Sequence, residues 1–230
     1  GNAGAAAELG HDLRQPVEID AGDGFTVLSI DIGTYPGGGR RADDGSLSWL
    51  AGDPVLGERA GTDARARDFD RLHAAWAARD DSLLRTARGA FCGVHLDTKQ
   101  RRLWLIADKL AVRPIFYALL DEYVCFATSL RTLLACPAIP RDGDLEGLVQ
   151  FATFGASLGE RTRVEAVRCL LPARVIELHR GGQQVLEYWR WDRIEAAPAD
   201  DDDICTVIRA SFDRAVRARL DPSGNAVSFL

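Results

Sequence analysis

The 230-residue sequence contains no methionine, no C-x-x-C pair and no long apolar run. No run approaches the roughly 20 apolar residues needed to cross a bilayer, and residues 1–15 lack the apolar core of a signal peptide. We therefore expect a cytoplasmic protein with no membrane partner. The net charge of −6 also argues against nucleic acid as a partner, because surplus cations are needed to neutralise phosphates.

Cysteine and histidine are too scattered for a disulfide framework or a metal site. The five cysteines are odd in number and far apart, which favours reduced, partly buried thiols: Cys92, Cys125, Cys136, Cys169 and Cys205. The four histidines show no short metal-ligand spacing, so we expect ordinary structural or surface roles for them: His11, His73, His95 and His179. We expect no metal ligands in this chain.

The sequence does have the composition of a globular protein. Its 47% hydrophobic and 27% charged residues suffice for a full core. Residues 1–22 are rich in Ala and Gly and predict a flexible lead-in, and residues 23–194 carry the patterns of one α+β domain. The acidic segment 195–203 is typical of a linker. Residues 204–230 contain an amphipathic helix and end in an apolar run, AVSFL, which predicts the start of a further domain.

Apolar periodicity predicts the elements of this domain. Strands are expected at 25–32 and 46–52, in hairpins at 89–97/101–108 and around Asp121–Glu122, and beside the late Gly-Gly turn. Helices are expected in 66–87, broken near Asp80–Asp81, and at 130–135, 144–155 and 204–220. Asp144 is a plausible N-cap and Gly155 a plausible stop for the third of these.

Four blocks in order resemble the asparagine-synthetase family, in its N-terminal glutamine-amidotransferase domain. "GAFCGVHLD" occupies the position of the family's G-M-F-A-F-A-L-W-D. "IADKLAVRPIFYA" resembles "ARDRLGIKPLYYA", matching at Asp108, Leu110, Pro114 and Tyr117. "FATSLRTLLA" is similar to "FASELKALLA", and the segment from "GDLEGLVQFATFG" to "LLPARVIEL" resembles the family's "LDLEALAQYLTFG" to "LPPGHLLEL". The blocks cover about half of the chain.

The resemblance implies a four-layer αββα sandwich of the N-terminal-nucleophile type. It also implies that 204–230 begins an α/β ATP-pyrophosphatase domain, with "SGNAVSFL" running towards the family's S-G-G-x-D-S loop. Phe229 and Leu230 would then lie near a nucleotide. ATP and Mg²⁺ are implied as cofactors of that missing domain, and no cofactor is expected for this chain alone. A small-molecule or peptide carboxylate is implied as the substrate, and a homodimer is possible.

An active glutaminase of this family begins with a cysteine, whose α-amino group serves as the general base. No cysteine lies in or before the first predicted strand, and the first thiol is Cys92. An internal cysteine has no free α-amine, and a thiol in a core is normally inert. We therefore predict no catalytic residue in this chain.

Other family elements match in part. The N-G-E segment, which supplies an oxyanion-hole amide, aligns with Ala51, Gly52 and Asp53 in "WLAGDP". Gly52 and Asp53 retain a backbone N–H and a carboxylate, whereas Ala51 lacks the amide, and loss of one oxyanion donor costs about 10²–10³ in rate. Pro54 additionally lacks an N–H. We predict a vestigial glutamine pocket that includes Gly52 and Asp53.

The family's Asp that holds the glutamine α-amino group corresponds best to Asp68, with Asp63 as the competitor. A purely structural role for Asp68 as a helix cap is the favoured alternative. Arg40 or Arg41 is a weaker match to the arginine that binds the substrate carboxylate.

Two further groups have structural and functional interpretations. Asp108 and Arg113 fit a structural ion pair or loop anchor better than an acid–base pair. The aromatic cluster of Tyr188, Trp189 and Trp191 fits packing at a domain seam, with a nucleotide or sugar platform as the alternative.

Three functions remain open. The leading one is an ATP-dependent amide-forming ligase that does not hydrolyse glutamine, as in the β-lactam synthetase and lasso-peptide cyclase branch. The second is a non-catalytic scaffold or binding module. The third is an active glutamine-hydrolysing asparagine synthase whose cysteine is masked by the lead-in.

Overall fold

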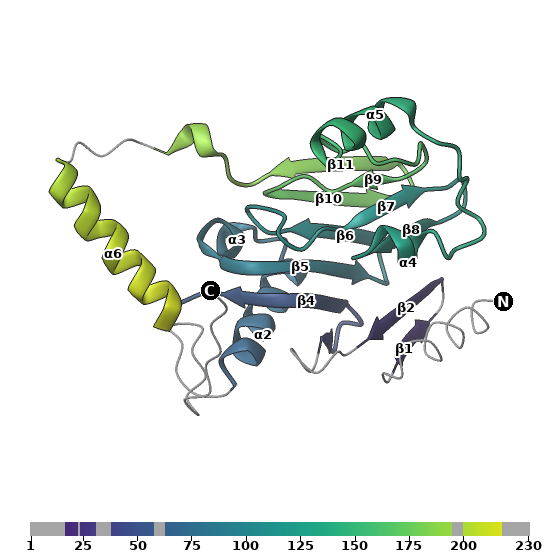
Figure 1. Cartoon of the computed structure of the whole chain (residues 1–230). Helices are drawn as coiled ribbons and strands as arrows, with labels where there is room; N and C mark the ends of the chain where they lie inside the picture. The colour runs from purple at the N-terminus through teal and green to yellow at the C-terminus, as the bar shows by residue number, and fades with distance from the viewer. Residues whose placement is uncertain (1–16, 23, 31–37, 58–62, 195–199, 218–230) are drawn as a thin grey trace.

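The computed structural model describes residues 17–22, 24–30, 38–57, 63–194 and 200–217. Its main sheet has six antiparallel strands in the spatial order β11-β10-β6-β5-β4-β3 (Figure 1). The strands are β3 Gly39–Arg41, β4 Leu47–Val55, β5 Arg88–Asp97, β6 Arg102–Ala107, β10 Arg174–His179 and β11 Gly182–Glu187. The β4–β5 ladder is the longest, running from Leu47 opposite Leu96 to Val55 opposite Arg88.

A smaller antiparallel sheet has the order β8-β7-β9, and a hairpin of β1 and β2 lies beside the main sheet. Their strands are β1 Val17–Gly22, β2 Phe25–Ile30, β7 Phe116–Leu119, β8 Val124–Ala127 and β9 Arg168–Cys169. The helices are α2 Ala64–Ala77, α3 Ser82–Thr86, α4 Leu130–Leu133, α5 Leu145–Phe154 and α6 Asp201–Arg217, with a 3-10 turn, η1, at Trp191–Arg193.

Alternation along the strands separates three apolar clusters. On β6, Leu105 belongs to the cluster between the two sheets, whereas Ile106 belongs to the cluster under α2 and α3. On β7, Tyr117 faces the cluster between the sheets and Ala118 faces the one that contains α4. Successive strand residues point to opposite faces. The layers are therefore α2 and α3, the six-stranded sheet, the three-stranded sheet and α4.

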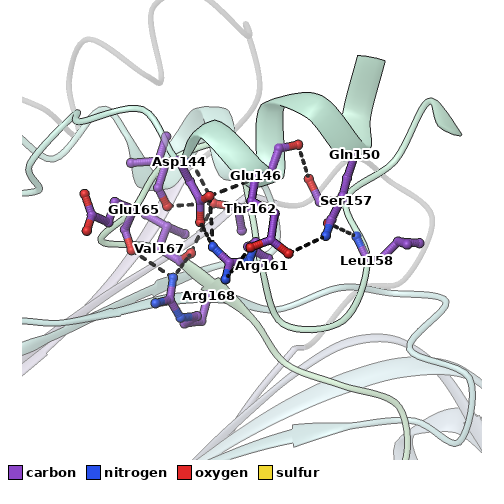
Figure 2. Close-up of polar contacts among 12 residues, drawn as sticks. Asp144, Glu146, Gln150, Ser157, Leu158, Arg161, Thr162, Glu165, Val167 and Arg168 are labelled. Carbon is purple, nitrogen blue, oxygen red and sulfur yellow. Dashed lines mark hydrogen bonds and ion pairs between the residues drawn. The ribbon is translucent and has the colours of Figure 1, made fainter. Parts of the chain in front are cut away.

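The expected α+β class is confirmed, as are the two hairpins and the break between α2 and α3, and the sheets are antiparallel. The Asp144 side chain caps α5 by accepting from the Gly147 N–H at 3.0 Å, and Gly155 ends the helix with φ +75°. Figure 2 shows Arg161 reaching this capping region, with ion pairs of 2.8 Å to Asp144 and 3.0 Å to Glu146.

Three expected boundaries need correction. The lead-in to residue 22 ends earlier, because 17–22 form β1, paired with β2. The strand expected at 46–52 continues through Pro54 to Val55; β3 pairs only with Leu47–Trp49, so a missing N–H is tolerated where that neighbour has ended. The linker to residue 203 overlaps α6, because Asp200 caps that helix by accepting from Asp203 N at 2.8 Å.

Two helices present apolar side chains to solvent. On α5, Leu145 and Phe154 are 76% and 66% exposed, and on α6, Phe212 is 70% exposed. Among the described residues, no helix has both the length and the apolar content required to cross a membrane. The AVSFL run lies outside the described residues.

Phe69 and Phe154 allow the same substitution to be compared at a buried and an exposed site. Phe69 lies on α2 and is fully buried in the apolar cluster between this helix and the main sheet. We expect Phe69→Ala to lower the free energy of unfolding by about 3–5 kcal/mol, because it removes transferred apolar surface and leaves a cavity. Phe154→Ala should change it by less than about 1 kcal/mol. Urea denaturation of both variants measures the difference, and equal losses would contradict this assignment of the core.

Candidate functional site

At its end, β4 comes very close to β5, and two glycines permit this approach. Gly52 and Gly89 have φ of +94° and +95°. A Cβ on Gly52 would lie 2.2 Å from the Ala90 carbonyl oxygen, and a Cβ on Gly89 would lie 2.1 Å from that of Asp53. Glycine adopts this φ without strain and adds no Cβ. The glycine predicted for the pocket is therefore required by the strand pairing itself.

Two guanidinium groups converge on Gly52. Arg65, in the first turn of α2, donates from Nε to the Gly52 carbonyl oxygen at 2.9 Å. Arg113 comes from the turn after β6, and its Nε lies 3.0 Å from where a Cβ on Gly52 would stand. The planar donor fork of arginine matches a carboxylate. This corner, defined by Gly52, Asp53, Arg65, Asp68 and Arg113, has the chemistry to hold a carboxylate.

The two predicted carboxylates come from neighbouring elements, Asp53 from β4 and Asp68 from α2. Asp53 follows Gly52 in β4, opposite Ala90. Asp68 is buried on α2, where its Oδ2 accepts from the Leu56 N–H at 3.2 Å and its Oδ1 lies 3.8 Å from Arg71. Asp68 therefore ties α2 to the segment after β4. It does not cap the helix as the favoured alternative supposed, since the N-cap position belongs to Asp63.

Arg40 and Arg41, the weaker matches to a carboxylate-binding arginine, form ion pairs with other aspartates. Arg40 pairs with Asp70 at 2.5 Å and lies 4.7 Å from the Phe69 ring centroid. Arg41 pairs with Asp20 at 3.2 Å. Arg65 and Arg113, and not Arg40 or Arg41, are the arginines that lie beside Gly52. Arg65 belongs to no recognisable motif and approaches Gly52 only through the fold, so sequence reasoning could not find it.

Cys92 lies opposite Ala51 in the ladder and belongs to the core between the sheets. Only 2% of its surface is exposed. Burial raises the pKa of the Cys92 thiol to about 12, against the weaker opposing effect of Arg113. A thiol with this pKa is protonated at neutral pH and is a poor nucleophile.

Asp108 is a loop anchor. Its Oδ2 accepts from the Phe91 N–H at 3.0 Å, and its Oδ1 accepts from Leu110 at 2.8 Å and from Val112 at 3.4 Å. The carboxylate is 1% exposed. Its acceptor sites are thus used to shape the turn that carries Arg113, which agrees with the structural interpretation of Asp108.

A second polar cluster lies under α2. Ser48 Oγ is 2.7 Å from His73 Nδ1 and 2.8 Å from His95 Nδ1. A hydroxyl can donate to one ring and accept from the other, an arrangement in which the two rings carry different tautomers. Burial lowers the pKa of both histidines, that of His95 to about 4. Their placement in the α2–sheet interface makes this a structural network, consistent with the roles expected for these histidines.

The remaining predictions have these outcomes. Among the described residues, no group of three His, Cys, Asp or Glu side chains is placed to hold a metal ion. His179 Nδ1 accepts from the Gly181 N–H at 3.0 Å in the β10–β11 turn. The expected nucleotide-binding residues, Phe229 and Leu230, lie outside the described residues.

A family model described as "Glutamine amidotransferase domain" matches residues 59–189, more than half of the chain. The chain belongs to the glutamine amidotransferase domain family. This match confirms the resemblance found in the sequence and covers Arg65, Asp68 and Arg113.

A curated relative of this amidotransferase-family chain is "Asparagine synthetase [glutamine-hydrolyzing] 3" of Bacillus subtilis (strain 168). It is 26% identical over 143 residues, which are 62% of this chain and 23% of that protein. The chain therefore spans about a quarter of the length of the relative that it matches.

Two solved structures share 13% and 14% identity with this chain. The first is glutamine phosphoribosylpyrophosphate amidotransferase from B. subtilis complexed with ADP and GMP, with TM-score 0.39, covering 66% of this chain and 31% of that chain. The second is described as the structure of the allosteric regulatory enzyme of purine biosynthesis, with TM-score 0.38, covering 65% and 30%.

The buried histidines of the amidotransferase-like domain predict a pH dependence of stability. His95 is neutral when folded but titrates near 6.5 when unfolded, so the unfolded state binds more protons at acidic pH. The stability from His95 is complete above pH 6.5 and is lost as pH falls towards 4, by about 3 kcal/mol. Urea midpoints measured between pH 7.5 and 4.5 check this, because His95→Gln should flatten the curve.

His179→Gln is the matched control, since His179 is exposed at the end of β10. It should retain the pH dependence of the wild type. A wild-type His95 ring that titrates near 6.5 by NMR would contradict the expectation even if His95→Gln fails to fold.

Proposed function

We propose that this domain is the amidotransferase-like part of an asparagine-synthetase-like, ATP-dependent amide-forming ligase, and that it no longer hydrolyses glutamine. The state of Cys92 carries the second half of this proposal. Its α-amine is tied up in a peptide bond because Cys92 lies inside β5, and its pKa is raised because the thiol is buried. Neither the thiolate nor the α-amine that this chemistry uses is available at that residue.

The similarity to asparagine synthetase supports the first half. The relative is a glutamine-hydrolysing enzyme by name, and this chain matches about a quarter of it. An ATP-pyrophosphatase domain beginning near α6, with ATP and Mg²⁺ as its cofactors and a carboxylate as its substrate, belongs to the proposal. The four-layer order of helices and sheets supports an αββα sandwich of the N-terminal-nucleophile type. An amine carried by the substrate itself would then replace ammonia, as in the β-lactam synthetase and lasso-peptide cyclase branch.

The corner supports the vestigial character of the pocket. Arg65 Nε hydrogen-bonds the Gly52 carbonyl oxygen, and Asp68 binds the Leu56 N–H, so both groups already stabilise the end of β4. Ala51 also lacks the side-chain amide that the family uses at this position.

The test of glutamine hydrolysis uses the full-length protein. Ammonia release from glutamine should stay at the buffer level, and 6-diazo-5-oxo-L-norleucine, which alkylates glutaminase nucleophiles, should add no mass. Cys92→Ala should change neither result. Ammonia release that a single cysteine substitution abolishes would overturn the proposal and favour the active glutaminase.

The ligase part is tested separately, by ATP–pyrophosphate exchange with candidate carboxylates. Exchange that requires a carboxylate supports the ligase, and exchange with aspartate alone would favour plain asparagine synthesis. No exchange with any carboxylate would favour the scaffold, for which the exposed apolar residues of α5 provide a docking face.

A further inference from the structure

A cleft of about 410 Å³ lies where the chain leaves β11, away from the corner at Gly52. Its lining combines apolar, aromatic and charged side chains. The apolar part comes from Leu171, Pro172 and Ala173, just before β10. The rest comes from Lys109 and from the segment between Glu187 and Asp192. Small-molecule sites typically have such an apolar wall with a few placed polar groups.

Two tryptophans form one wall of this cleft. The Trp189 and Trp191 rings are 4.7 Å apart between centroids at an interplanar angle of 67°. They fall on the same side of the chain because Arg190 between them is extended, with φ −144° and ψ 142°. Tyr188 fixes the segment by donating from its hydroxyl to the Ala107 carbonyl oxygen at 2.7 Å. Trp191 nevertheless remains 66% exposed, so its ring has a free stacking surface.

The cleft holds one cation without an anionic partner among the described residues. Lys109 Nζ lies 5.6 Å from the Trp189 ring centroid, and no described carboxylate pairs with it. The two arginines of the lining are neutralised. Arg174 pairs with Glu160 at 2.9 Å, and Arg190 pairs with Asp192 at 2.6 Å. The half-buried position of Lys109 lowers its pKa, as does Arg88, so an anion would relieve an unfavourable environment.

We propose that this cleft binds a small aromatic anion, namely one flat ring system that carries a single carboxylate or phosphate group. The ring stacks on the exposed face of Trp191, and the anionic group pairs with Lys109. Trp189 lies between these two groups, since it contacts both, so ring and charge are separated by no more than the span of one small ligand. Aromatic stacking supplies affinity for any flat ring, and the ion pair adds selectivity for charge.

The cleft is distinct from the proposed vestigial glutamine pocket. Its lining shares no residue with the corner of Gly52, Asp53, Arg65, Asp68 and Arg113. The inference therefore holds or fails independently of whether the parent protein is a ligase. An adenine nucleotide and an aromatic carboxylate share the required chemistry, and the experiment distinguishes them.

Isothermal titration of the full-length protein uses four probes: AMP, adenosine, inorganic phosphate and indole-3-acetate. AMP or indole-3-acetate should bind, and adenosine and phosphate should each bind at least tenfold more weakly, because each lacks one half of the ligand. Binding of AMP alone identifies a phosphate ligand, and binding of indole-3-acetate alone a carboxylate. If adenosine binds as tightly as AMP, the ion pair is refuted. If phosphate binds as tightly as AMP, the stacking is refuted.

The chain offers a matched control, because Lys99 and Lys109 are its two lysines. Lys99 lies in the β5–β6 turn, outside the cleft. Lys109→Ala should weaken binding at least tenfold, Lys109→Arg should largely restore it, and Lys99→Ala should leave it unchanged. Trp191→Ala should weaken binding of the ring probes but not of phosphate. Equal affinities of Lys109→Ala and Lys99→Ala would overturn the proposal.

Acylation of lysines by acetic anhydride gives a second readout that does not depend on variants. Mass spectrometry should show slower modification of Lys109 in the presence of the bound probe, with unchanged modification of Lys99. Equal protection of both lysines, or of neither at a probe concentration that saturates the titration, would place the ligand elsewhere. A synthetase domain with its own nucleotide site would still give binding, but it would leave Lys109 unprotected.

Discussion

The buried carboxylate of Asp108 is the interaction on which much of this structure depends. It binds the N–H of Phe91 in β5 and those of Leu110 and Val112 in the following turn. The Asp108 carbonyl oxygen accepts from Ala173 at 2.9 Å, just before β10. One residue thus joins three parts of the main sheet. A buried acceptor that leaves several N–H groups unsatisfied when removed is expensive to replace, which explains why an acidic residue occupies a core position.

The Gly52 corner shows how strand packing and site chemistry share the same residues. The positive φ of Gly52 and Gly89 lets β4 and β5 approach closely, and this exposes the Gly52 carbonyl oxygen to Arg65. A substrate-binding role and a purely structural one therefore predict the same glycine. The two roles differ in what the polar side chains around the glycine bind. In this structure Arg65 and Asp68 both bind backbone groups of the β4 region.

Much of the fold could be predicted from the sequence because its signals are local. The β5–β6 and β7–β8 hairpins follow from alternation around short turns, and α5 from the Asp144 cap and Gly155. The prediction that this strand ends before Pro54 was wrong. Pro54 is tolerated because β3 no longer pairs with β4 at that point, and the sequence does not show where β3 ends. The site was only partly predictable. Gly52, Asp53 and Asp68 came from a family comparison, whereas Arg65 reaches Gly52 only through the packing of α2.

The turn after β6 connects the corner with the cleft. Asp108 holds residues 108–112, and this same turn carries Lys109 to the tryptophans and Arg113 to Gly52. Ala173, which hydrogen-bonds Asp108, also lines the cleft and accepts from the Tyr188 N–H at 3.0 Å. The two cations therefore project from one rigid turn to two separate sites. Because the Asp108 anchor serves the sheet itself, the turn that presents Lys109 and Arg113 does not depend on any chemistry at the corner.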